Sequence, residues 1–155
     1  MTTKVLLIVH PESDYLEAMT FSGLTKLLGD ENVVTYPFKK SYYGIADDDY
    51  ILDDGKRGFT SPYENIAPRK GEPYTIDRIV AEWDQFTHVI MATMRTQGIR
   101  AMRELISVVG DRWWQPFAMI DGEDSTRIRW ELVREFRPVI YFQREYEKNK
   151  RIHYP

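Results

Sequence analysis

PFAMIDGEDSTRIRWELVREF, residues 116–136, changes character three times and is the stretch that decides the fold class. Its apolar beginning, Phe117–Ile120, is typical of a buried strand. A turn with three carboxylates begins at Asp121, and from Ser125 onward apolar residues recur at helical spacing. In an open α/β sheet, ligands bind outside the carboxyl ends of the strands, where such turns lie. We therefore expect the working face of the protein to carry Asp121.

The same succession of strand, turn and helix recurs along the rest of the chain. The predicted strands are Val5–Val9, Asn32–Tyr36, His88–Met94, Phe117–Ile120 and Val139–Phe142. The predicted helices run from Asp14 to Gly29, from Thr75 onward, over Gln97–Val109, and from Ser125 to Arg137. Strands that alternate with helices favour a parallel sheet with right-handed crossovers and helices on both faces. We predict an α/β three-layer sandwich with a five-stranded, mainly parallel sheet, Rossmann-like or flavodoxin-like.

Capping signals indicate where these helices begin. Asp14, with Glu17 three residues later, resembles a capping box. Thr75 is expected to cap the second helix, and Asp124 or Ser125 the helix of the opening stretch.

The composition bounds the class of protein. The chain has 155 residues, of which 43% are hydrophobic and 14% aromatic, which is enough for one domain with a sizeable core. We therefore expect a single Rossmann-like domain over residues 1–155. The 21 basic and 24 acidic residues give a formal net charge of -3, so the overall charge gives no reason to expect nucleic acid or an anionic membrane as a partner.

Two features of the sequence bear on the cellular compartment: the number of cysteines and the length of the first apolar run. The sequence has no cysteine, which excludes disulfides, thiolate metal sites and cysteine nucleophiles and fits a reducing environment. The first apolar run, Val5–Val9, is too short for a signal segment or a membrane span. We expect a cytoplasmic protein with no membrane span.

Residues 38–74 have neither helical nor strand periodicity and are rich in Gly, Pro, Asp and Tyr. A connection this long is typical of a functional lid or arm, so we expect a long loop insertion after the second strand. Its acidic run, Asp47–Asp54, lacks the ligand spacing of a calcium loop and fits a solvated charged loop. Gly55–Thr60, which contains Arg57, is either an ordinary turn or a cation brought to an anionic ligand. The last segment, residues 143–155, is charged and is expected to be a terminal helix or tail.

Polar side chains follow four of the predicted strands at the point where each strand ends. Because the carboxyl ends of parallel strands meet at one edge of a sheet, we expect these side chains to converge there. The candidates are His10, Arg95, Thr96, Asp121, Glu123 and Arg144. We assign His10 and Asp121 as candidate catalytic groups and the other four, with Arg57, as candidate ligand-binding groups.

The two candidate catalytic residues have structural alternatives. His10 is the only histidine expected at this edge and is the candidate for a group that titrates near neutral pH, but a lone histidine before proline is often structural. Asp121 either accepts hydrogen bonds from sugar hydroxyls, or acts as a base, or has a structural role. Nearness to a helix N-terminus favours the ionised carboxylate, which suits base or hydroxyl-binding work.

Other motifs point less directly to chemistry. Arg95, Arg100 and Arg103 lie near the beginning of one predicted helix, where they either hold an anion or are simply solvated. Trp113-Trp114 is interpreted as packing, with a sugar-stacking platform as the alternative. No group of residues has the spacing of a metal site, and no GxGxxG or GxxxxGK[ST] follows the first strand, so we expect neither a metal nor a bound cofactor.

In the order of its motifs the chain resembles the amino-terminal half of CgeB-like bacterial glycosyltransferases of the two-domain GT-B type. The matching pieces are DYLEAMTFSGLTKLLG at 14–29, VTYP at 34–37, YYG at 42–44, RGFT at 57–60, IDGED at 120–124 and YFQRE at 141–145. The resemblance runs along most of the chain. It implies a Rossmann-like half that faces a sugar acceptor, while a second half binds the nucleotide sugar.

Two functional hypotheses follow. In the first, the chain is a glycosyltransferase-like domain that binds an acceptor or a nucleotide sugar and needs a donor-half partner or a second domain for sugar transfer, because the chain ends at Pro155 where the family continues into that half. In the second, the same fold serves as a noncatalytic ligand-sensing or protein-interaction module.

Overall fold

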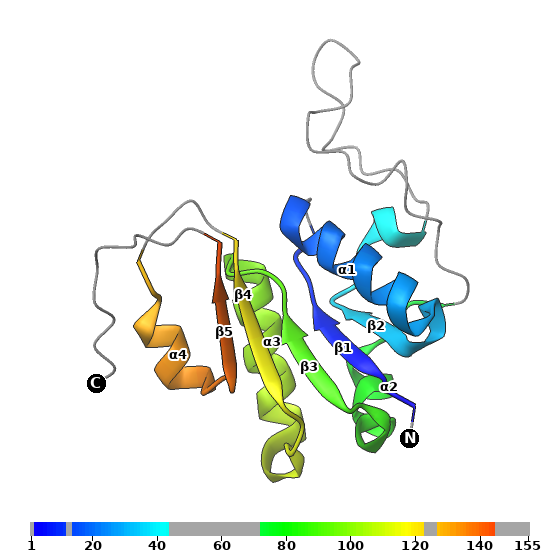
Figure 1. The fold of residues 1–155 in the computed structure, drawn as a ribbon. Helices are drawn as coiled ribbons and strands as arrows, with labels where there is room; N and C mark the ends of the chain where they lie inside the picture. The colour runs from blue at the N-terminus through cyan, green and yellow to red at the C-terminus, as the bar shows by residue number, and fades with distance from the viewer. Residues whose placement is uncertain (1, 12–13, 44–71, 123–126, 145–155) are drawn as a thin grey trace.

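The computed structural model describes residues 2–11, 14–43, 72–122 and 127–144. In it, five strands form one sheet in the order β2-β1-β3-β4-β5, and all four pairings are parallel (Figure 1). The strands are β1 (Val5–Ile8), β2 (Val33–Tyr36), β3 (His88–Met91), β4 (Phe117–Asp121) and β5 (Ile140–Gln143). This is the flavodoxin-like strand order of doubly wound folds, and it confirms the predicted fold class.

Helices cover the sheet unequally. They are α1 (Tyr15–Leu28), α2 (Ile76–Ala81), α3 (Thr96–Val109) and α4 (Trp130–Phe136), with short 3-10 turns η1 (Asp30–Asn32), η2 (Lys40–Tyr43), η5 (Trp83–Gln85) and η6 (Gly110–Arg112). Right-handed crossovers place a helix on one face or the other according to the direction in which the chain moves along the sheet. The chain moves from β1 outward to β2 through α1, and toward β5 through α2, α3 and α4. Accordingly α1 lies alone on one face, the α1 face, and the other three lie on the opposite face, the α3 face (Figure 1).

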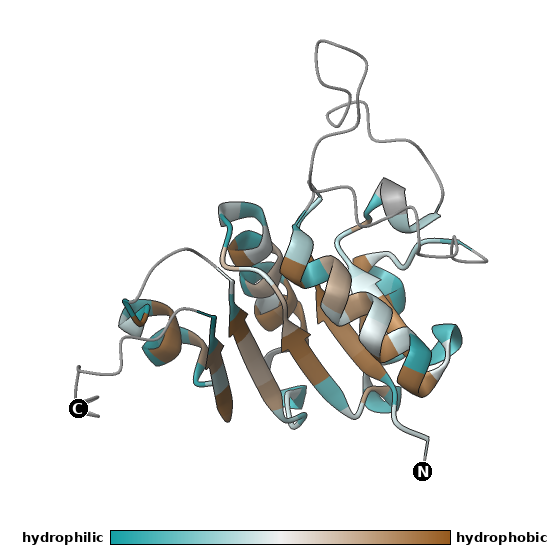
Figure 2. Ribbon diagram, turned by 45° about the horizontal axis from the view of Figure 1, so that its top comes forward, coloured by the Kyte–Doolittle hydropathy of each residue, from teal (hydrophilic) through white to brown (hydrophobic). Residues whose placement is uncertain are grey.

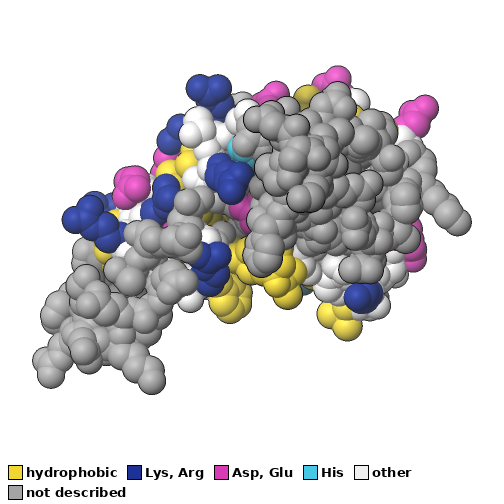
Figure 3. Space-filling model, turned by 90° about the horizontal axis from the view of Figure 1, so that it is seen from above, with side chains coloured by type: hydrophobic (Ala, Val, Ile, Leu, Met, Phe, Trp, Pro, Cys, Tyr) yellow, Lys and Arg dark blue, Asp and Glu magenta, His cyan; other side chains and the backbone are white. Residues whose placement is uncertain are grey.

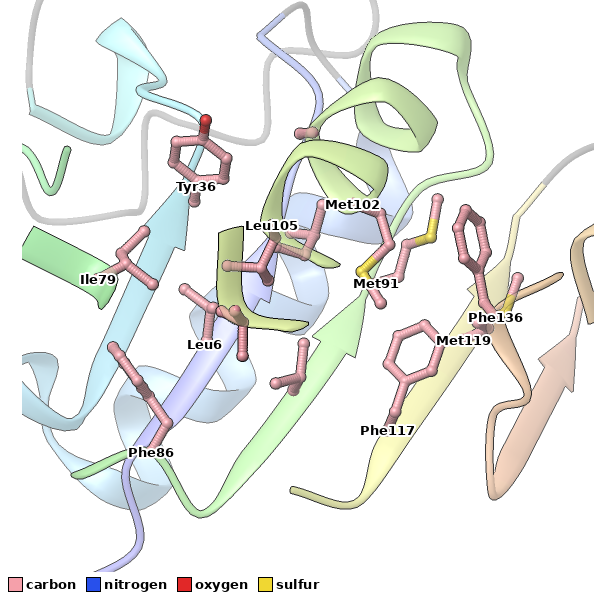
Figure 4. Packing of buried hydrophobic residues seen from close by; sticks show 14 of the residues in the cluster. Leu6, Tyr36, Ile79, Phe86, Met91, Met102, Leu105, Phe117, Met119 and Phe136 are labelled. Atoms are coloured by element: carbon pink, nitrogen blue, oxygen red, sulfur yellow. The ribbon is translucent and has the colours of Figure 1, made fainter. Parts of the chain in front are cut away.

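The larger core cluster lies on the α3 face. Alternate strand residues such as Leu6, Met91 and Met119 point to this face and pack against Met102 and Leu105 of α3 (Figure 4). All five are fully buried. The strands therefore read as nearly continuous apolar runs in the sequence because the centre of the sheet is covered on both sides (Figure 2).

The smaller cluster lies on the α1 face, over β1 and β2. It joins Leu7, Val9 and Val33 of the sheet region to Phe21 of α1 and to Tyr42 of η2. The rings of Phe21 and Tyr42 are stacked with centroids 4.1 Å apart. This contact fixes the turn that follows β2 against α1.

The predicted caps at Asp14 and Thr75 are confirmed, but the capping box predicted for Asp14 and Glu17 is formed only in half. The Asp14 carboxylate accepts a hydrogen bond from the Glu17 backbone N–H at 3.1 Å, and the Thr75 hydroxyl accepts from the Arg78 N–H at 3.3 Å. In a full capping box, the Glu17 side chain would return to the Asp14 N–H. Instead it accepts a hydrogen bond from the backbone of His10, so the box is not closed.

The helix predicted from Ser125 begins later than expected. Its first residue is Trp130, its N-cap residue is Arg129, and none of the described side chains caps it. The expectation that Asp124 or Ser125 caps this helix is therefore wrong; both residues lie outside the described ranges. The physical reason is a contact distant in sequence, because the Arg129 N–H donates to the Tyr141 hydroxyl at 3.4 Å.

The long insertion and the chain end are described in part. Of residues 38–74, the structure describes 38–43 and 72–74, so the acidic run and Gly55–Thr60 lie outside it, as does most of the predicted terminal segment. In the described ranges, every helix is too short or too polar to cross a lipid bilayer.

The two helical glycines Gly23 and Gly98 give a matched test of the packing. A Cβ on Gly98 in α3 would lie 2.4 Å from Thr93 Cγ2, whereas one on Gly23 in α1 would meet no atom within 4 Å. We predict that Gly23→Ala raises the free energy of unfolding by about 0.5–1 kcal/mol, and that Gly98→Ala lowers it by about 1–3 kcal/mol, measured by urea unfolding. Adding Thr93→Ser, which removes the clashing methyl group, should restore most of the loss. Equal stabilisation by both alanines would contradict this packing.

Candidate functional site

The strand order places a switch point between β1 and β3. The chain leaves β1 toward the α1 face and leaves β3 toward the α3 face, so the two connections diverge at the carboxyl edge of the sheet. In open α/β sheets, ligands bind where neighbouring strands diverge in this way. His10 follows β1, and Arg95 and Thr96 follow β3. Figure 3 views this edge from above and shows basic, acidic and histidine side chains gathered there.

The beginning of α3 is built to present backbone donors. Arg95 occupies the N-cap position, and no described side chain caps the helix there. The Arg95 N–H is bonded at 3.3 Å by the hydroxyl of buried Thr93, and the absence of a side chain at Gly98 lets the first turn approach Thr93 closely. An uncapped helix N-terminus carries a partial positive charge and orphan N–H groups, which suit an anionic group.

Arg95 brings a cation to the same place. Its side chain is 41% exposed, and its Nε lies 3.8 Å from Oδ2 of Asp14, the N-cap residue of α1. This ion pair is long and partly solvated. The pair joins the first turns of α1 and α3 across the switch point.

The backbone of His10 is bonded to a buried polar cluster that could not be predicted from the sequence. The Glu17 carboxylate, which is fully buried, accepts a hydrogen bond from the His10 backbone N–H at 2.5 Å and from the Tyr42 hydroxyl at 3.0 Å. The ammonium of Lys39, also fully buried, donates to the same carboxylate. Three segments of chain, those after β1 and β2 and the first turn of α1, therefore meet at one side chain.

Burial dominates the chemistry of this carboxyl. Desolvation raises the pKa of Glu17 from 4.5 to about 7, against the lowering influence of the Lys39 ammonium and of the His10 N–H. The Glu17 carboxyl therefore gains or loses its proton near neutral pH. Because the cluster is fully buried, it positions the turn at His10 and does not itself offer a surface to a ligand.

Asp121 is buried at the end of β4 and has described partners. Its Oδ2 accepts a hydrogen bond from the Tyr141 hydroxyl at 2.5 Å and lies 3.6 Å from Arg129 Nε. Its backbone carbonyl accepts from the Arg144 N–H at 2.9 Å, which ties the ends of β4 and β5 together. Burial and the Asp121 carboxylate hold the pKa of Tyr141 above its ordinary value.

The predicted site residues fall into three groups. His10 follows β1, and Arg95 and Thr96 follow β3, at the carboxyl ends of two neighbouring strands. Asp121 and Arg144 meet at the ends of the next two strands, β4 and β5. Arg57 and Glu123 lie outside the described residues.

The remaining sequence motifs have structural partners. Arg103 donates two hydrogen bonds to Glu135 of α4, at 2.6 and 2.8 Å, so it braces two helices. Trp113 packs against Trp83 and Phe117, with ring centroids 5.1 and 6.0 Å away, which confirms the packing interpretation for this residue. It precedes β4 and therefore belongs to the opposite edge of the sheet. The described residues include no group of three or more side chains placed to hold a metal ion.

Sequence patterns do not identify as site residues five side chains that the structure places beside His10 and Asp121: Glu17, Lys39, Tyr42, Arg129 and Tyr141. Glu17 was noticed only as part of a capping signal, and Lys39 stands beside another lysine in a polar stretch. Tyr141 is recognisable as a partner of Asp121 only once the pairing of β4 with β5 is known.

The fold and this edge together define a doubly wound α/β domain of flavodoxin-like strand order with a polar switch point. Comparisons of the chain with family models, curated proteins and solved structures found no match.

The raised pKa of Glu17 gives a prediction about pH. The folded state holds this proton more tightly than the unfolded chain, so its stabilising contribution is full below about pH 4.5 and is lost as the pH rises through about 7. The loss is on the order of 3 kcal/mol, because one pKa unit corresponds to about 1.4 kcal/mol. In Glu17→Gln, which cannot titrate, this fall in the free energy of unfolding between about pH 5 and about pH 7 should be absent.

Denaturant unfolding at several pH values measures the effect, and Glu135→Gln is the matched control. Its hydrogen bonds from Arg103 lower the pKa of Glu135, so that carboxyl titrates below the window and its removal should leave the slope unchanged. A Glu17→Gln variant with the slope of the unsubstituted protein would refute the assignment.

Proposed function

We propose that this domain binds a small polar ligand with an anionic group at the switch point between β1 and β3, as the acceptor-side half of a glycosyltransferase-like pair. The observation that carries the proposal is the divergence of the chain after these two strands. It supports a ligand position bordered by His10 on one side and by Arg95 and Thr96 on the other.

The electrostatics of this edge support an anionic ligand. The first turn of α3 has orphan N–H groups, and Arg95 stands at its N-cap position with a partly exposed side chain. A phosphate or carboxylate placed there would accept hydrogen bonds from the helix N-terminus and pair with the guanidinium.

The glycosyltransferase reading rests on the resemblance of the chain to CgeB-like enzymes. Asp121 and Tyr141, which belong to two of its matching pieces, IDGED and YFQRE, are neighbours in space, because the Tyr141 hydroxyl donates to the Asp121 carboxylate. In this proposal Asp121 holds Tyr141 and Arg129 at the ends of the strands and is a positioning residue. His10 is the candidate base, and Arg144 is a further ligand contact at the end of β5. Sugar transfer requires a second, donor-binding half.

Binding is tested by thermal unfolding against nucleotide sugars, nucleotides, free sugars and inorganic phosphate. A ligand at a hundred times its dissociation constant adds about 2.7 kcal/mol to the stability of the protein that binds it. We expect a clear rise in Tm with a nucleotide sugar, which combines an anion with hydroxyls. Arg95→Ala should weaken binding about tenfold or more, since a charge-assisted contact contributes about 1.5–3 kcal/mol.

The matched control is Arg112→Ala, which removes an exposed arginine at the opposite edge of the sheet and should leave binding unchanged. His10→Gln reports on the histidine, with each shift measured against the Tm of the same variant without ligand. A shift with phosphate alone would favour the noncatalytic ligand-sensing alternative. Absence of any shift across the panel, or equal loss in both arginine variants, would overturn the proposed site.

A further inference from the structure

The two faces of the sheet differ in how far their cover extends. On the α3 face, Leu6, Met91 and Met119 of β1, β3 and β4 are all fully buried. On the α1 face, Leu7 of β1 is fully buried, but exposure rises across the sheet until Ile140 and Phe142 of β5 are 49% and 56% exposed. Figures 1 and 2 agree that α1 lies over β1 and β2 while no described helix stands in front of β4 and β5. Among the described residues, this part of the sheet therefore has no helix over it and its outer strand is exposed, although parallel sheets are normally covered on both faces.

The helix beside this bare half has an unusual outer surface. Met19 and Leu27 of α1 are 52% and 79% exposed, and Tyr15 is also exposed. The two charged residues of α1 are Glu17, which is buried, and Lys26. By contrast, α3 has the same length of 14 residues and exposes Arg100, Arg103 and Glu104. A helix whose outer surface is also apolar is typical of one covered on both sides.

We use the name bare-half surface for the exposed apolar residues of this face: Tyr15, Met19 and Leu27 of α1 and Ile140 and Phe142 of β5. The contact between α1 and the sheet edge is close at one end, where a Cβ on Gly122 would lie 2.7 Å from Leu16 Cδ2. The surface thus has a ridge, α1, and a floor, whose exposed part is β5. Exposed apolar surfaces of this kind mark protein interfaces.

We propose that the bare-half surface binds a second copy of this chain. A two-fold axis parallel to the strands places α1 of each copy over β4 and β5 of the other, so that the two helices lie side by side in one layer between two sheets. The same operation covers both the ridge and the floor of each copy, which is the self-complementarity that a two-fold interface requires.

The charge of the surface favours a copy of itself over a charged partner. A charged partner would need opposite charges on the surface that it binds, and like charges that meet across an interface are unfavourable. The α1 ridge offers Lys26 as its one exposed charge, and β5 has the uncharged sequence Ile-Tyr-Phe-Gln. Depletion of charged residues is also what distinguishes the centres of protein interfaces.

The size of the contact predicts its strength. A helix of 14 residues is about 21 Å long and about 10 Å wide, a footprint of roughly 200 Å². Two such contacts, each counted on both surfaces, bury about 800 Å² or somewhat more, which lies at the low end for specific complexes. We therefore expect a dimer that dissociates on dilution, with a dissociation constant in the micromolar range.

Sedimentation velocity over a range of about 1 to about 500 μM tests this, since it brackets the affinities that a small interface gives. The unsubstituted protein should shift from monomer to dimer. Phe142→Glu and Met19→Glu, each on a different element of the surface, should weaken dimerisation at least tenfold. Both side chains are more than half exposed, so circular dichroism and Tm should change little.

The control is Val108→Glu, at a residue of α3 that is 47% exposed on the opposite face; it should dimerise like the unsubstituted protein. A protein that stays monomeric throughout the range would overturn the proposal. So would a dimer that survives both substitutions, or one that Val108→Glu disrupts equally.

A disulfide experiment tests the arrangement itself, because the chain has no cysteine. One preparation has Met19→Cys and the other Ile140→Cys; mixed and oxidised, they should give a covalent dimer containing one chain of each. Each preparation alone should give far less, because α1 of one copy faces β5 of the other and not its own counterpart. Equal yields in the mixture and in the separate preparations would contradict the two-fold arrangement.

Discussion

The buried pairing of Glu17 with Lys39 is the interaction on which the described structure depends most. Both side chains are fully buried, and replacing either by an apolar residue would leave the other without its hydrogen-bond partner, which in such buried pairs costs about 3–5 kcal/mol. The same carboxylate also accepts from the His10 backbone and the Tyr42 hydroxyl. A single side chain thereby sets the turn after β1, the first turn of α1 and the segment that leaves β2.

The strand order explains why the polar edge and the bare half of the sheet occur together. The chain moves outward once, from β1 to β2, and then in the opposite direction through three crossovers. Right-handed crossovers turn this reversal into one helix on one face and three on the other. Where the direction reverses, the connections diverge, which is where ligands bind in such sheets. Where the described residues place only one helix on a face, Ile140 and Phe142 of β5 are exposed. Both features are consequences of one topological constraint.

Much of the fold could be predicted from the sequence, because its signals are local. The β-rich run at Val5–Val9, the cap at Asp14 and the stop at Gly110 each depend on a few neighbouring residues, and the structure has a strand, a cap and a C-cap there. The strand order was not predictable in this way, since pairing depends on contacts far apart in the chain. The early beginning assigned to the last helix failed for a related reason: Tyr141, twelve residues later, holds the Arg129 N–H at the residue before Trp130, where the helix begins.

In the candidate site, too, local signals place some residues, while the environment of others depends on contacts far apart in the chain. That His10, Arg95 and Thr96 share an edge follows from strand ends alone, and the parallel sheet brings them there. The environment of Asp121 did not follow, because its burial and its bonds to Tyr141 and Arg129 require the register of β4 with β5. Lys39 was equally hidden: a lysine in a polar stretch predicts exposure, and only the approach of η2 to α1 turns it into a buried partner of Glu17.

Helix α1 is where these separate features meet. Its N-cap residue, Asp14, pairs with Arg95 across the switch point, and Glu17 in its first turn holds the backbone of His10. Its inner surface packs on β1 and β2 through Phe21, while Met19 and Leu27 form the ridge of the bare-half surface. The residues that contact the His10 backbone and the Arg95 side chain, and the residues of the ridge, therefore belong to the same helix. The edge that we propose for the ligand and the face that we propose for the second copy are therefore joined by one element and not by a chain of loops.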